Sequence, residues 1–307
     1  MLDAFLLRRY PGDFERTVAI REFVEKLCRW FVDSGRADKQ FLAQLCSGDE
    51  ARYWQRLSEA LLARELAAAD LSFGSSNAGP DFVLEANGRR IWIEAICPMP
   101  SNVPAEWLRF LPGEVKDFPH QAMLLRWTAA IKEKAEKLLG NPEKGLRGYL
   151  DKGIVGPDEA YVIAVNGRML RHVFPEMNGI SGFPFAAEAT FGVGCRRLHL
   201  DRATRRVLHQ DYAHNPYIMR PQGEPVPACA FLDDRYRAVS AIWATDLDDT
   251  GILGNPRPMV VVHNPYAANP ISVALLPAFD EYVLTVQGET GSLDRLDGRL
   301  NKPAPRA

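Results

Sequence analysis

The 307-residue chain contains 47% hydrophobic and 25% charged residues and carries a formal net charge of −2 at pH 7. This length and composition suit one large globular domain or two small ones with a full hydrophobic core. The near-neutral balance excludes a global positive field, so any surface that binds a polyanion must be local.

No membrane-spanning or secretory segment is expected. No apolar stretch reaches the roughly 20 residues that span a bilayer, and the N-terminal residues lack an uninterrupted signal-peptide core. The five cysteines are scattered, with no CxxC pattern and no cluster with histidine, which argues against a zinc site or a disulfide framework. These features predict a cytoplasmic protein without a membrane partner.

The first half of the chain is expected to change from helices to a hairpin. Residues 1–50 form a mostly helical region, and apolar residues recur at helical spacing over 16–33 and 51–70. Short strands are expected at 71–73, 82–86, 90–96 and 161–165. Asn87-Gly88 separates two of them and is the strongest two-residue hairpin signal. A helix is expected over 120–139, after a proline-rich loop.

The second half contains many Pro and Gly residues between short strand-like runs. These runs are 196–200, 238–244, 259–263, 271–275 and 281–286. The order of elements predicts an α/β fold with helices on both faces of a mixed sheet. We divide the chain into an N-terminal helical region (1–50), this core (51–168), a β-rich C-terminal elaboration (169–287) and a polar, flexible tail (288–307).

Asp81 and Glu94 lie at the same end of the expected hairpin. Alternate residues of a strand share a face, so Glu94 shares one with Trp92 and Ile96. The strand IWIEAI around Glu94 is apolar on both faces, which is typical of a central, buried strand. A carboxylate there is costly unless it is paired or bound to a metal. Two converging carboxylates form a hard-oxygen site suited to Mg²⁺.

The stretch from Gly79-Pro80-Asp81-Phe82 through the hairpin to Trp92-Ile93-Glu94-Ala95 resembles the core of the PD-(D/E)XK nuclease superfamily. The resemblance covers roughly residues 50–166. It implies a restriction-endonuclease-like core in which an Asp and a Glu bind a divalent ion and a Lys two residues after the Glu serves the attacking water. Here that position is Ile96, a departure from the pattern. Either the basic residue comes from elsewhere, or the site is inactive.

The helix expected over 120–139 offers three lysines for this role. With Ile131 on its apolar stripe as the reference, Lys134 lies about 60° away, Lys132 about 100° and Lys137 about 120°. Lys134 is thus best placed to reach the sheet with its stem on apolar surface. The resemblance includes members with the lysine on a following helix, which makes Lys134 the candidate. The alternative is a solvated lysine at the helix edge.

The preceding helix often supplies one more acidic residue in this superfamily. Glu59 and Glu65 are both available, and the helix is apolar nearly all round, so periodicity does not choose between them. The resemblance favours Glu59, which is followed by Leu, Ala and Arg within one turn. For either glutamate, the alternative role is an ion pair with an arginine.

The hypothesis that follows is an Mg²⁺-dependent endonuclease, with Mn²⁺ as an alternative ion. Asp81, Glu94 and the carbonyl of Ala95 hold the metal, which polarises the scissile phosphate and lowers the pKa of a bound water. The phosphate backbone would be contacted by Arg126, Arg196 and Arg197. DNA is the expected partner, RNA is the alternative, and a homodimer would suit cleavage of both strands.

Other interpretations stay open. Ile96, in place of the lysine, would also suit a catalytically inactive member of the superfamily that binds nucleic acid or a protein. A further alternative is a purely structural hairpin, which would need no metal. The sequence 246–250, DLDDT, imitates the phosphatase motif DxDxT, but only 57 residues follow Thr250 and they lack the downstream elements of that fold. His263-Asn264 ends the strand expected over 259–263 and lacks the further histidines of an HNH nuclease, so His263 is expected to be a turn histidine at the end of that strand.

Overall fold

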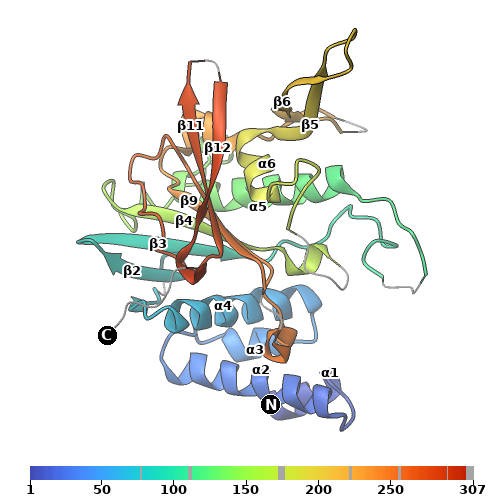
Figure 1. Ribbon diagram of the computed structural model, residues 1–307. Helices are drawn as coiled ribbons and strands as arrows, with labels where there is room; N and C mark the ends of the chain where they lie inside the picture. The colour runs from blue at the N-terminus through green and yellow to red at the C-terminus, as the bar shows by residue number, and fades with distance from the viewer. Residues whose placement is uncertain are drawn as a thin grey trace.

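The computed structural model describes residues 1–76, 78–109, 113–171, 177–220, 223–254, 257–288 and 290–301. These residues form three layers, in which an eight-stranded mixed sheet lies between two groups of helices (Figure 1). Helices α1 to α4 cover one face, and α5 and α6 cover the other. Each face has its own hydrophobic cluster. The expected mixed α/β fold is confirmed at this level.

Six α-helices are present in the described part of the chain. They are α1 (Leu2–Arg9), α2 (Glu15–Asp33), α3 (Phe41–Leu45), α4 (Glu50–Ala68), α5 (His120–Leu139) and α6 (Phe185–Phe191). Their apolar stripes explain their positions, because each long helix turns its buried residues towards the sheet or towards another helix. In α5, for example, Trp127, Ile131 and Leu138 are buried against the sheet.

The large sheet has the strand order β1-β2-β3-β4-β9-β10-β11-β12. The strands are β1 (Phe73–Gly74), β2 (Phe82–Ala86), β3 (Arg89–Ile96), β4 (Ala160–Asn166), β9 (Ala241–Thr245), β10 (Met259–His263), β11 (Asp280–Gln287) and β12 (Thr290–Asp297). Strands β3, β4 and β9 are parallel neighbours. They are buried on both faces, as their continuous apolar runs predict.

The hairpin β2–β3 has the register expected from its sequence. Asn87 (φ 53°) and Gly88 (φ 72°) both adopt positive φ, as a two-residue primed turn requires. The turn pairs Val83 with Trp92 and Phe82 with Ile93. One further step along this register places Asp81 opposite Glu94. Val83 and Trp92 both pack on the α5 side, so Asp81 and Glu94 project to that side.

The C-terminal half was expected to be a β-rich elaboration packed on the core, and its strands instead continue the core sheet. Strands β9 to β12 extend the sheet that begins with β1 to β4, because β9 pairs directly with β4. Smaller sheets outside it are formed by β5 (Val193–Leu200) with β6 (Val207–His214) and by β7 (Tyr217–Ile218) with β8 (Val226–Pro227). The expected strand at 271–275 is wrong. Prolines flank this segment, and Ala274 has φ 59°, which interrupts an extended backbone.

The expected flexible tail is also corrected over most of its length. Residues 290–297 form β12, which pairs with β11 from Gln287↔Thr290 to Asp280↔Asp297. Their polar composition reflects an exposed edge strand rather than an unfolded segment. Residues 302–307 of the expected tail lie outside the described residues. Within the described residues, no helix has the length and apolar character needed to cross a membrane.

Candidate active site

The candidate site lies at the end of the β2–β3 hairpin, between α4 and α5. Glu94 is buried in β3 (2% exposed), next to the parallel strand β4. Asp81 immediately precedes β2 and is only partly buried. The hairpin register therefore brings to one place the two carboxylates that are 13 positions apart in the sequence.

Strand β3 extends beyond the first residue of β2, which leaves Ala95 without a strand partner on that side. Its N–H donates a hydrogen bond to Oδ2 of Asp81 at 2.7 Å. Its carbonyl oxygen lies 3.4 Å from Nε2 of Gln55. Oδ1 of Asp81 makes no hydrogen bond with the described residues. Two oxygens, Oδ1 of Asp81 and O of Ala95, thus retain capacity for a ligand.

Helix α5 brings two lysines to Glu94. The Nζ atoms of Lys134 and Lys137 lie 3.1 Å and 2.6 Å from the same oxygen, Oε1 of Glu94. The Lys134 side chain is only 7% exposed, whereas that of Lys137 is 45% exposed. The hydroxyl of Tyr149 donates to the other oxygen, Oε2, at 3.3 Å. The buried carboxylate is therefore paired, as its burial requires.

Helix α4 lies on the other side of the site and contributes Glu59, which is 6% exposed. Arg56 pairs with Glu59 at 2.9 Å and with Asp38 at 3.0 Å. Gln55 donates to Glu59 at 3.1 Å and accepts a hydrogen bond from the N–H of Cys97 at 2.9 Å. Gln55 therefore joins α4 to the end of β3, where the two carboxylates converge.

A cavity of about 590 Å³ brings these groups together. Its lining contains as many basic as acidic side chains. The basic ones are Arg52, Arg56, Arg126, Lys134 and Lys137, and the acidic ones are Asp38, Glu59, Asp81, Glu94 and Glu133. The carboxylates of Glu59, Asp81 and Glu94 do not all approach within 4.8 Å of one another. The three acids therefore do not form a compact cluster of three carboxylates.

The electrostatics of the cavity disfavour the charged form of Asp81. Burial, together with repulsion from Glu94 and Glu59, raises the pKa of Asp81 to about 7. Burial likewise raises the pKa of Glu59, against the attraction of Arg56. Burial alone would lower the pKa of Lys137, but Glu94 outweighs it and the pKa is raised. Burial and Glu94 raise the pKa of Tyr149 to about 12.

Glu65, the less favoured alternative to Glu59, and two of the arginines considered as phosphate contacts lie outside the cavity. Glu65 does not line the cavity and lies 3.9 Å from Arg64. Arg196 and Arg197 belong to β5, outside the cavity, where Arg197 forms a bidentate ion pair with Asp211 and Arg196 contacts Gln210. The physical reason is that β5 belongs to a separate hairpin. Arg126 does line the cavity, and its Nε donates to the carbonyl of Met99 at 2.8 Å.

The DLDDT segment (246–250) and His263 had other catalytic interpretations, and both form ion pairs inside the protein. Asp246 and Asp248 both pair with Arg171, at 2.6 Å and 2.7 Å. His263 is the last residue of β10, where the expected strand ends, and its Nε2 lies 2.6 Å from Oε2 of Glu281. Both groups are buried and serve as internal polar contacts of the fold.

Gln55 and Tyr149 were not predicted from the sequence, and Lys137 contacts Glu94 although its helical position was less favourable than that of Lys134. Lys137 reaches Glu94 because a lysine stem can cross the helix surface from an unfavourable angle. Gln55 lies one helical turn before Glu59, a spacing that would have placed it on the same face. Comparison of the chain with protein-family models, curated proteins and solved structures finds no match to any of the three.

Proposed function

We propose that this protein is a metal-dependent nuclease that hydrolyses phosphodiester bonds, with DNA as the expected substrate. The observation that carries the proposal is the juxtaposition of Asp81, Glu94, the Ala95 carbonyl and the Lys134 amine around one cavity. A restriction-endonuclease-like arrangement of α4 to β4 belongs to the same proposal. It is supported by the hairpin β2–β3, the following helix α5 and the parallel strand β4.

The donor set fits Mg²⁺ or Mn²⁺. These ions prefer carboxylate and carbonyl oxygens and keep several waters. Asp81 and Glu94 would supply the carboxylates and Ala95 the carbonyl, and the free Oδ1 of Asp81 supports this fit. A bound divalent ion supplies Lewis acidity towards the phosphate and a water of lowered pKa.

The remaining groups have roles that follow from their positions. Lys134 is held by Glu94 inside the cavity, where its amine would orient the attacking water or stabilise charge on the phosphoryl oxygens. Lys137 and Arg126 also line the cavity and carry positive charge towards a polyanionic substrate. Glu59 and Gln55 would hold the end of β3, and thereby the Ala95 carbonyl, in position.

The direct test is cleavage of plasmid DNA, and of single-stranded RNA, with Mg²⁺ or Mn²⁺. We expect the wild type to cleave, and Asp81→Asn to lose about 10³-fold in rate, because loss of a metal ligand removes several kcal/mol of transition-state stabilisation. Glu65→Gln changes a carboxylate of α4 outside the cavity and should cleave like the wild type. Equal cleavage by Asp81→Asn and the wild type would refute the proposal.

A second candidate is a catalytically silent member that binds nucleic acid. It is favoured by Ile96, which is buried against the α5 face where the family pattern has a lysine, and by the two lysines already paired with Glu94. Binding of DNA or RNA that depends on Lys137 and Arg126, without cleavage in either metal, is the outcome expected of it.

A further inference from the structure

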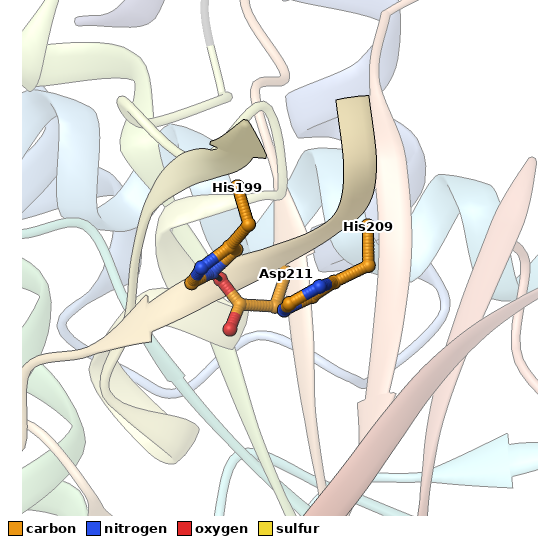
Figure 2. A group of neighbouring side chains, drawn as sticks. All are labelled: His199, His209 and Asp211. Carbon is orange, nitrogen blue, oxygen red and sulfur yellow. Dashed lines mark ion pairs between the residues drawn. The ribbon is translucent and has the colours of Figure 1, made fainter. Parts of the chain in front are cut away.

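The hairpin of β5 and β6 extends away from the three-layered body (Figure 1). His199 and His209 are register partners on its two strands, and Asp211 follows His209 by two residues, on the same face. The ring centroids of His199 and His209 are 3.9 Å apart and the two rings are stacked. Figure 2 shows the two imidazoles and the carboxylate directed towards one another. Strand pairing thus gathers three ligand-type side chains.

This cluster stands out within the described residues. It is the one group of three His, Cys, Asp or Glu side chains whose ligand atoms all lie within 4.8 Å of one another. Nε2 of His199 is shielded from solvent and makes no well-aligned hydrogen bond with the described residues. It lies 3.2 Å from Oδ1 of Asp211, as an ion pair if the imidazole is protonated. A nitrogen and a carboxylate oxygen this close can share a cation, which is either the imidazole proton or a metal ion.

Asp211 is prepared to act as an anionic ligand. Both of its oxygens accept hydrogen bonds from Arg197 at 2.8 Å, and this bidentate pairing holds the carboxylate in one orientation. Each carboxylate oxygen offers two lone-pair positions, so the pair with Arg197 leaves capacity for a metal. Arg197 would then orient the ligand from behind, as outer-shell partners of metal ligands commonly do.

We propose that His199, His209 and Asp211 form a binding site for a divalent transition-metal ion, with Zn²⁺ as the best match. Two imidazoles and one carboxylate suit Zn²⁺ and its first-row neighbours, whereas Mg²⁺ prefers oxygen alone. At Zn–N and Zn–O distances of about 2.0 Å, tetrahedral ligands lie about 3.3 Å apart. The stacked imidazoles would have to rotate about their side-chain bonds to bring ligand atoms now within 4.8 Å to that separation. One coordination position stays open for water.

Such an ion would join β5 to β6 near the tip of the hairpin. Most side chains of both strands are exposed, so hydrophobic burial contributes little to holding this hairpin in place. A metal that binds only the paired strands stabilises the pairing by its binding free energy. The site is distinct from the cavity of Asp81 and Glu94, whose donors are oxygens, and it does not depend on the proposed nuclease activity.

The test is calorimetric titration of the full chain with Zn²⁺ in the presence of excess Mg²⁺, which would compete for any site built of oxygens alone. We expect one Zn²⁺ per chain, and at least about tenfold weaker binding for His209→Ala and for Asp211→Asn. Hydrogen exchange of the backbone amides of residues 193–214 should slow when Zn²⁺ is added to the wild type and should not change in His209→Ala.

Two control variants separate this site from adventitious binding. His214→Ala removes an exposed histidine of the same strand, and Cys195→Ser removes the exposed thiol of β5. Both should bind Zn²⁺ like the wild type. The proposal is overturned if His209→Ala binds as tightly as the wild type, if binding is lost in Cys195→Ser or His214→Ala instead, or if exchange in the hairpin is insensitive to Zn²⁺.

Discussion

Two acidic clusters in this molecule look alike in sequence and differ in what surrounds them. Asp246 and Asp248, after β9, are 1% and 3% exposed. Asp248 contacts Arg171, Arg168 and Arg257. Burial disfavours its charged form, but Arg171 outweighs this and the pKa of Asp248 is lowered. Asp246 also pairs with Arg171, although burial still raises its pKa.

The cluster of Asp81 and Glu94 has a different arrangement. It lines a cavity of about 590 Å³, and Asp81 has no arginine or lysine among its hydrogen-bond partners in the described residues. Its pKa is raised to about 7 rather than lowered. A perturbed carboxylate in an open cavity, with a free oxygen, is typical of a functional site, whereas a paired cluster contributes to the fold. An acidic motif is therefore best judged by its partners.

The largest effect that would test this comparison is a loss of stability at the paired cluster. Asp248→Ala leaves three arginines without a shared partner in a buried environment. Breaking such a pair costs about 3–5 kcal/mol, so we expect the free energy of unfolding, measured in urea, to fall by that amount. Thr250→Val is the matched control, because it removes a hydroxyl that donates to Asp248 and accepts from Arg257 but leaves every charge of the cluster in place. A change below about 1 kcal/mol for Asp248→Ala would contradict the assignment of this cluster to the fold.

Substitution of the two lysines that contact Glu94 should give the next largest effect, a loss of cleavage rate. Lys134→Met keeps the buried stem and removes the amine, so we expect cleavage to fall about 10²–10³-fold, mainly in kcat. Lys137→Met should lower cleavage about tenfold, because the Lys137 side chain is 45% exposed and its charge is screened by solvent. Steady-state kinetics of both variants measures which of the two lysines contributes more to cleavage. A reversal of the two magnitudes would assign the role to Lys137.

The site residues that local geometry determines were predictable from the sequence. A hairpin register follows from Asn87-Gly88 and the alternation around it, so Asp81 and Glu94 could be placed at one end. Helical angles likewise brought Lys134 towards the sheet. The lengths of α5 and β10 were also predicted correctly, because both have strong periodicity and clear ends.

What could not be predicted depends on packing between distant elements. Gln55 contacts Ala95 only because α4 crosses the end of β3. Strand β12 forms because β11 offers it an edge, although its own composition is polar. The pairing of His199 with His209 depends on an irregular register near the tip of the β5–β6 hairpin. In each case, the residues carry too little local information to specify their partners.

The smallest effect concerns stability and bears most directly on the comparison. It is the pH dependence of the difference in stability between Asp81→Asn and the wild type. The pKa of Asp81 rises from 3.8 in the unfolded chain to about 7 in the folded protein. The folded state therefore binds more protons between these values, and stability falls as pH rises through this window. Asparagine keeps an acceptor for the Ala95 N–H and carries no charge. We thus expect Asp81→Asn to be about 1–2 kcal/mol more stable than the wild type at pH 8, and equally stable near pH 4.

Thermal unfolding at both pH values, with and without Mg²⁺, measures this difference. A divalent ion would offset the repulsion among Asp81, Glu94 and Glu59, so Mg²⁺ should raise the melting temperature of the wild type at pH 8 and leave that of Asp81→Asn unchanged. Near pH 5 the proton on Asp81 competes with the metal, and the shift should shrink. A variant less stable than the wild type at pH 8 would mean that Asp81 is a structural partner like Asp248, and the distinction between the two clusters would fail.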